Sequence, residues 1–159
     1  VPIKGNIKEE ENNLSMNVKY INMKGEKINP YILEQGTDFM AEVVIKNTSY
    51  QDLHQLALSQ MFPSGWEIRN TRMDNVSSSH LKDNPNYQDF RDDRVYSYFN
   101  LKRGQTKTFR VILNASYIGE FFLPITYCEA MYDNEYFSRK AGGTVRVVKA
   151  GGELSTVEE

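Results

Sequence analysis

The stretch YCEAMYDNEY holds the only cysteine of the chain, Cys128, which is followed directly by Glu129. A cysteine acts as a nucleophile or a metal ligand when it is a thiolate, and thiolates form near a cation or at a helix N-terminus. Glu129 would instead raise the pKa of the thiol. The strand pattern described below groups Cys128 with Phe122, Thr126 and Ala130, and small side chains beside an aromatic ring are typical of a core. We therefore interpret Cys128 as a buried structural residue.

Other residue types that carry out chemistry are few and widely spaced. The chain has two histidines, His54 and His80, and neither forms a ligand motif with the other or with Cys128. Zinc sites and cysteine–histidine nucleophiles both need such partners. The motifs G-x-S-x-G and H-E-x-x-H and the glycine-rich phosphate and dinucleotide loops do not occur. The sequence therefore predicts a protein that is not an enzyme, with no metal and no cofactor.

The acidic segment from 83 to 93 is the remaining candidate for cation binding. Its aspartates do not follow a calcium loop, which places oxygen ligands at alternate positions around a central glycine. Asp92 and Asp93 stand between two arginines, Arg91 and Arg94. We therefore interpret both aspartates as structural carboxylates of a solvated loop that pair with arginine.

Length and composition describe one folded domain. The chain has 159 residues, of which 12% are aromatic, and this is enough apolar material to bury a core without a metal or a disulfide. The net charge of −2 leaves no basic excess, so we expect no nucleic-acid partner. No apolar run approaches the ~18 residues of a membrane helix, so we expect no membrane segment in this chain.

Hydrophobic residues recur with a period of two. In DFMAEVVIKN, residues Phe39, Ala41 and Val43 share one face while Met40 and Glu42 share the other, which indicates a half-buried strand. Similar runs are separated by glycine-containing turns. The expected strands span 15–21, 38–47, 56–62, 94–101, 106–114, 120–132 and 144–148. We therefore predict an all-β fold, an antiparallel β-sandwich of seven to nine strands.

The ends and one internal stretch lack this period. We predict a linker over 1–13, a sandwich domain over 14–149 and a flexible tail over 150–159. The polar stretch 71–93 is long for an internal loop. We expect it to be the most mobile internal segment, with a short strand near 87–90.

The single tryptophan, Trp66, follows Pro63 and Gly65 at the start of an expected strand. An exposed tryptophan would suggest a sugar platform or a binding hot spot. A tryptophan that enters a sandwich strand is more typical of a core, and we interpret Trp66 as structural.

Three stretches of the chain share a recognisable pattern, in the order LALSQMFPSGWEIRN (56–70), DFRDDRVYSYFNLKRGQTKTFRVILNASYIGEFFLP (89–124) and CEAMYDNEY (128–136). Together they resemble the C-terminal macroglobulin-like domain of bacterial alpha-2-macroglobulins of the Bacteroidetes type. The resemblance covers nearly all of the expected domain, and the specific feature is the combination of F-P-S-G-W-E, R-D-D-R and C-E-A-M-Y-D. It implies an immunoglobulin/macroglobulin-like sandwich.

The resemblance also implies a role. The family consists of large multidomain envelope proteins that trap peptidases, and many members carry a thioester with the motif C-x-E-Q. Cys128 is followed by Glu129, Ala130 and Met131, so it does not match the thioester cysteine. The implied partners are the neighbouring macroglobulin and thioester-type domains of the same parent chain and, indirectly, peptidases. The implied location is the cell envelope, in the periplasm or anchored in a membrane and facing it.

The segment after Ala130 is the candidate interaction surface, because exposed aromatic and methionine side chains rimmed by polar ones are typical of interfaces. It consists of Met131, Tyr132, Asp133, Asn134, Tyr136 and Phe137. Alternatively, Tyr132 and Phe137 close the end of the sandwich.

Two functions from different classes follow. The first is a non-catalytic interaction domain of an alpha-2-macroglobulin-like endopeptidase inhibitor. The alternative is a free-standing carbohydrate-binding or adhesin-type module, which a β-sandwich with 10 tyrosines would also suit.

Overall fold

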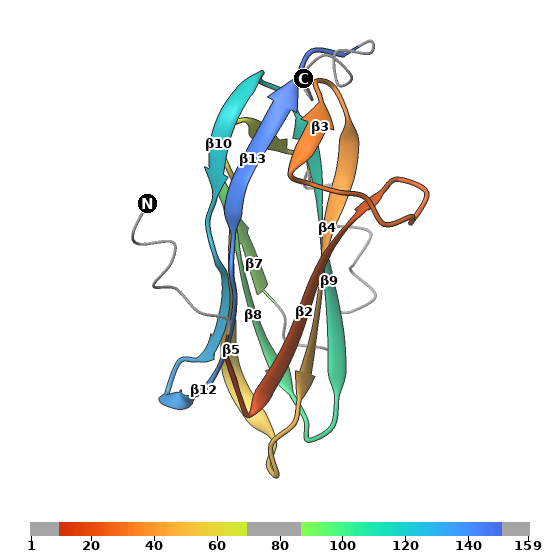
Figure 1. The fold of residues 1–159 in the computed structure, drawn as a ribbon. Coiled ribbons are helices and arrows are strands. Elements are labelled where there is room, and N and C mark those ends of the chain that lie inside the picture. The colour runs from red at the N-terminus through yellow and green to blue at the C-terminus, as the bar shows by residue number, and fades with distance from the viewer. Residues whose placement is uncertain (1–9, 70–86, 151–159) are drawn as a thin grey trace.

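The computed structural model describes residues 10–69 and 87–150, and every regular element within these ranges is a β-strand (Figure 1). The strands are β1 (Glu10–Asn12), β2 (Leu14–Asn22), β3 (Ile32–Glu34), β4 (Asp38–Asn47), β5 (Leu53–Met61), β6 (Trp66–Ile68), β7 (Tyr87–Phe90), β8 (Arg94–Leu101), β9 (Thr106–Ala115), β10 (Gly119–Leu123), β11 (Thr126–Ala130), β12 (Asp133–Lys140) and β13 (Gly143–Val148). The all-β prediction is confirmed.

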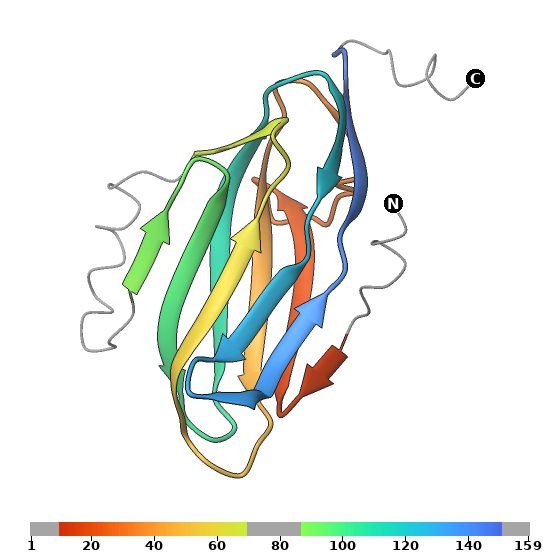
Figure 2. The ribbon, with the colours of Figure 1, turned by 90° about the vertical axis from the view of Figure 1, so that its left-hand side faces the viewer.

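The strands form three sheets that together make a sandwich (Figures 1 and 2). The six-stranded sheet has the order β1-β12-β11-β5-β8-β7, the four-stranded sheet β2-β4-β9-β6, and the three-stranded sheet β10-β13-β3. Pairings between the described strands are antiparallel except for β13 with β3. The described residues contain more strands than the seven to nine predicted. Strands β1, β3 and β6 are edge strands of three residues that show no period of their own, and the single strand expected over 120–132 is divided into β10 and β11.

The ends and the long loop are described only in part. Strand β1 lies within the predicted linker and pairs with β12. Strand β7 occupies the place where a short strand was expected and pairs with β8. The remaining parts of those predictions, 1–9, 70–86 and 151–159, lie outside the described residues.

Two apolar clusters fill the sandwich. The first is built around Trp66, which is 2% exposed and whose ring centroid lies 4.9 Å from Phe39 and 5.8 Å from Tyr20. The second contains Phe99 and Phe109, with ring centroids 4.7 Å apart. Edge-to-face and tilted ring pairs of this kind add to the free energy gained by burial.

The segment 120–132 is not the single strand that its apolar pattern predicted. Strand β10 ends at Leu123 and β11 begins at Thr126, because Pro124 has no N–H to donate to a ladder and interrupts the pairing. The grouping of Phe122 with Cys128 was therefore wrong. Phe122 is 44% exposed on the three-stranded sheet, whereas Cys128 is fully buried in the six-stranded sheet.

The chain that pairs with β10 and β11 is interrupted opposite Pro124. There, β12 pairs with β11 and β13 pairs with β10. At this point the chain passes so close to β10 that a Cβ on Gly142 would lie 1.7 Å from the backbone oxygen of Leu123. The next residue, Gly143, has more room, since its Cβ would meet only the ring of Tyr31 at 3.4 Å. Of these two glycines, only Gly142 is required for close packing of backbone on backbone.

This difference gives a matched pair of variants. We expect Gly142→Ala to destabilise the fold by about 3 kcal/mol or more, because backbone cannot yield as a side chain can. Gly143→Ala is expected to change the free energy of unfolding by less than about 1 kcal/mol. Urea unfolding of both variants measures the difference, and equal stabilities would contradict the close contact.

Candidate functional site

The turn between β11 and β12 forms an exposed apolar end. Met131 and Tyr132 are 53% and 52% exposed. The backbone N–H of Met131 donates to the carbonyl of Gln55 at 3.0 Å, which ties the turn to the start of β5. Tyr132 therefore does not close the sandwich end but projects from a turn that is fixed by backbone pairing.

A second exposed ring lies at the same end of the molecule. Tyr50, in the turn between β4 and β5, is 94% exposed, and Figures 1 and 2 show this turn at the same end as the β11–β12 turn. Its neighbour Gln51 donates from Nε2 to the hydroxyl of Tyr136 at 2.6 Å, which links the two turns. Sequence reasoning missed Tyr50, although the polar stretch NTSYQD around it is typical of an exposed turn.

The other predicted interface residues lie elsewhere. Tyr136 faces inward and packs against the second core cluster. Phe137 points to the opposite face of the sheet, where the guanidinium of Arg139 lies 5.0 Å from its ring centroid. Asp133 accepts a hydrogen bond from the N–H of Glu135 within the turn. The side chain of Asn134 lies outside the described residues. The structure thus keeps Met131 and Tyr132 together at the end and separates the aromatic pair that follows.

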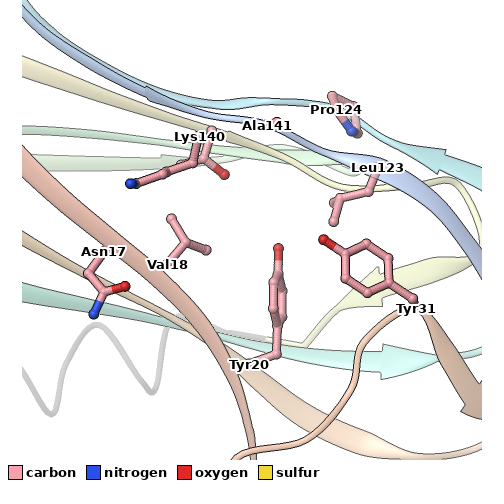
Figure 3. Close-up of a pocket in the computed structure, with 9 residues that line it drawn as sticks. Asn17, Val18, Tyr20, Tyr31, Leu123, Pro124, Lys140 and Ala141 are labelled. Carbon is pink, nitrogen blue, oxygen red and sulfur yellow. The ribbon is translucent and has the colours of Figure 1, made fainter. Parts of the chain in front are cut away.

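A pocket of about 260 Å³ lies where β10 and β13 diverge from β11 and β12 (Figure 3). Its lining residues come from β2, from the segment before β3 and from the two strand breaks. They are Asn17, Val18, Tyr20, Tyr31, Leu123, Pro124, Thr126, Lys140 and Ala141. The hydroxyls of Tyr20 and Tyr31 both point into this space (Figure 3).

The polar groups of the pocket are suited to hydrogen bonding. Tyr20 is 9% exposed, and its burial, with a smaller contribution from the nearby phenol of Tyr31, raises the pKa of its hydroxyl above the usual value. It therefore stays protonated. The ammonium of Lys140 lies 3.7 Å from the carboxylate of Glu11. No carboxylate, histidine or cysteine is among the lining residues that the structure describes.

Cys128 is fully buried, and its burial, with a smaller contribution from Glu129, raises the pKa of the thiol. His54 is exposed at the start of β5, and His80 lies outside the described residues. Within 10–69 and 87–150, no group of three or more histidine, cysteine, aspartate or glutamate side chains could hold a metal ion. The described part of the chain therefore provides neither a reactive thiolate nor a metal centre.

Of the two aspartates that were predicted to pair with arginine, Asp93 does so, whereas Asp92 has no ion pair with a described arginine. Asp93 receives two hydrogen bonds from the guanidinium of Arg94, at 2.9 and 3.2 Å. Its backbone oxygen accepts from the N–H of Phe62 at 2.8 Å, which joins the turn before β8 to the end of β5. Arg91 pairs with Asp89, while Asp92 is exposed. These contacts hold a turn and form no ligand set.

The environment of Cys128 predicts slow thiol labelling. A thiol with a raised pKa is protonated at pH 8, where the thiol of the unfolded chain, with a pKa near 8.5, is partly ionised. We expect a small thiol reagent to modify native protein only at the rate of unfolding. As the pH rises above the usual thiol pKa, the unfolded state gives up its proton first, so stability falls. Stoichiometric labelling within minutes at pH 8 would contradict burial.

A mutant cycle tests the packing around the thiol. Ser138 lies directly opposite Cys128, is fully buried, and has no hydrogen-bond partner for its Oγ among the described residues. We expect Cys128→Ala to cost about 1 kcal/mol and Cys128→Ser to cost no more, because the new hydroxyl meets that of Ser138. In a Ser138→Ala background the serine loses this partner and is expected to cost about 1 kcal/mol more. Denaturant unfolding that shows no coupling between the two positions would contradict this.

Within the described residues, no helix is long and apolar enough to cross a membrane. No curated protein sequence matches the chain significantly. Solved structures do match it. A Salmonella alpha-2-macroglobulin mutant, Y1175G, superposes with a TM-score of 0.77 at 18% identity, over 89% of this chain and 10% of that one. A structure of native Escherichia coli alpha-2-macroglobulin, from domain MG7 to the C-terminus, gives 0.76 at 17% identity, over 88% of this chain and 24% of that one.

These likenesses establish the fold, and this chain spans about a tenth of the Salmonella protein. The sequence itself matches, over residues 14–135, the family model described as the bacterial alpha-2-macroglobulin MG10 domain. This span includes the strands of the six-stranded sheet from β5 to β11 and the exposed turn at Met131 and Tyr132. The chain therefore belongs to the bacterial alpha-2-macroglobulin MG10 domain family.

Proposed function

We propose that this chain is a non-catalytic interaction domain of an alpha-2-macroglobulin-like endopeptidase inhibitor of the bacterial cell envelope. Its partners would be neighbouring macroglobulin and thioester-type domains of the same parent chain. The observation that carries the proposal is the exposed pair Met131 and Tyr132 on a fixed turn, in a domain whose described residues contain no catalytic constellation.

Solved structures of related proteins connect the family with peptidases. The Escherichia coli protein is described as activated by porcine elastase and, in another structure, by trypsin. The Salmonella protein is described as reacted with methylamine. Because this chain shares a family with proteins that peptidases activate, we propose an inhibitory role for its parent protein.

The exposed end is suited to docking because it is rigid before any partner arrives. Gln55 has a φ of 59° at a bulge in β5, its N–H bonds to the side chain of Asn100 at 3.0 Å, and its carbonyl holds Met131. Large side chains on such a support lose little freedom on binding. Methionine and tyrosine are also enriched in interface cores, so Met131 and Tyr132, with Tyr50 of the β4–β5 turn at the same end of the molecule, are the anchors we assign.

The family match favours this role over the alternative of a free-standing module. The proposed envelope location rests on membership of the family. It is tested by fractionation of cells with an antibody against the chain, and recovery in the cytoplasm alone would refute it.

Two methionines of equal exposure provide the functional test. Met131 is 53% exposed and Met23 is 52% exposed, so serine replaces a similar apolar area at each position. In the full-length parent protein, Met131→Ser or Tyr132→Ser is expected to reduce peptidase trapping about fivefold or more, because an interface anchor is lost. Met23→Ser is expected to leave trapping unchanged.

Trapping is measured with a peptidase that still cleaves a small chromogenic peptide but is shielded from a large protein substrate. The 159-residue chain alone is expected to inhibit nothing. Full trapping by both Met131→Ser and Tyr132→Ser would remove this turn from the interface, and inhibition by the chain alone would overturn the interaction-domain proposal.

A further inference from the structure

The outer face of the six-stranded sheet carries rings and polar groups in two rows that cross the strands. Figure 2 shows this sheet from its outer side. In the first row, Tyr127 of β11 lies opposite Ser59 of β5, which lies opposite Tyr96 of β8. These three side chains are half-buried, while their neighbours in sequence, such as Leu58 and Ser97, are buried. The first row therefore faces outward.

The second row lies beside the first, two residues away on each strand. Glu129 of β11 is opposite Ala57 of β5, Ala57 is opposite Tyr98 of β8, and Tyr98 is opposite Tyr87 of β7. Tyr87 and Tyr98 are stacked, with ring centroids 5.8 Å apart and 26° between their planes. We call the two rows together the aromatic face.

A strip of small side chains runs through the middle of the aromatic face along β5. It consists of Ala57 and Ser59, between Tyr96 and Tyr98 on one side and β11 on the other. Strands β8 and β11 are two strand spacings apart, which is about 9–10 Å. Large side chains therefore flank two small ones, and Met61, the next outward residue of β5, bounds the strip at one end.

The groups beside this strip are held in place before any ligand binds. The hydroxyl of Tyr127 donates to Glu129 at 2.6 Å. The guanidinium of Arg91 lies 6.0 Å from the ring centroid of Tyr96, and Arg94 donates to the Tyr96 hydroxyl at 3.3 Å. Rings and polar groups that are already oriented lower the entropic cost of binding.

Charges on and beside the aromatic face compensate one another. Three arginines stand against four carboxylates, one of which is that of Glu129. The ion pairs are Arg139 with Glu10, Arg91 with Asp89 and Arg94 with Asp93. The three ion pairs cancel, and the remaining carboxylate, that of Glu129, accepts a hydrogen bond from the Tyr127 hydroxyl. The face therefore has no strong field of either sign and suits an uncharged ligand.

We propose that the aromatic face binds a linear, uncharged polysaccharide along β5. Tyrosine rings present apolar area to the C–H faces of sugar rings, and their hydroxyls remain available for hydrogen bonds. Ser59, Glu129 and the arginines supply donors and acceptors that match the sugar hydroxyls. A protein partner fits less well, because interface cores are depleted in charge, whereas here paired charges surround the rings. This site is separate from the turn at Met131 and does not depend on the proposed function.

Amide chemical shifts of the labelled 159-residue chain test the proposal. The probes are three neutral β-1,4-linked hexasaccharides, namely cellohexaose, xylohexaose and mannohexaose. We expect at least one to cause saturable shifts at Ala57, Ser59 and Tyr98. Because an uncharged ligand is not screened, its affinity is expected to change less than about twofold between low and high salt. The absence of saturable shifts with all three probes, or shifts confined to other parts of the molecule, would overturn the proposal.

Three variants distinguish the contribution of the Tyr98 ring to binding from that of its hydroxyl and from effects on stability. Tyr98→Ala is expected to weaken binding about tenfold or more, and Tyr98→Phe to retain most of it, since the ring makes the contact. Ser59→Arg keeps the packed rings and blocks the strip, so it is expected to abolish binding even if Tyr98→Ala unfolds the domain. Tyr117→Ala, at a ring that is 54% exposed between β9 and β10, is the control and should bind normally. Undiminished binding by folded Ser59→Arg would refute the site.

Discussion

The approach of Gly142 to the backbone oxygen of Leu123 is the contact that the rest of the architecture depends on. It lets two paired strands leave one sheet and continue in another, so that β11 and β12 belong to the six-stranded sheet while β10 and β13 belong to the three-stranded one. Between β10 and β11, Pro124 ends the strand pairing. Between β12 and β13, the missing Cβ of Gly142 permits the close approach of the two backbones. The pocket around Tyr20 and Tyr31 lies at this divergence, because strands that separate leave space that side chains only partly fill.

The fold could be predicted from the sequence where strands are long and covered on one side. Alternation in DFMAEVVIKN and its counterparts placed β4, β8 and β9, since a period of two is a local property of each strand. The break at Pro124 was present in the sequence but was outweighed by the apolar residues around it. Edge strands such as β1 and β3 have three residues each, too few to show a period, and are fixed by the partners that they find in the folded chain.

The candidate surfaces also differ in how far local sequence predicts them. Met131 and Tyr132 follow the last residue of a strand, so their exposure could be expected from the turn alone. Tyr136 and Phe137 are adjacent in sequence and therefore point to opposite faces, which a contiguous surface prediction could not accommodate. The aromatic face has no signature in the sequence, because its rows join strands that are far apart in the chain, and only the register of β5, β8 and β11 brings Ala57 and Tyr98 beside Glu129.

Strand β11 explains why one short stretch serves structure on one side and recognition on the other. Its inward positions hold Cys128 and Ala130, which have to be small and apolar to pack against the second core cluster. Its outward positions hold Tyr127 and Glu129, which bond to one another. The cysteine is inert for a geometrical reason, since the alternation that turns Glu129 to solvent turns the thiol into the core. Chemistry at this strand is therefore confined to its outer side, where the ring of Tyr127 and the carboxylate of Glu129 lie.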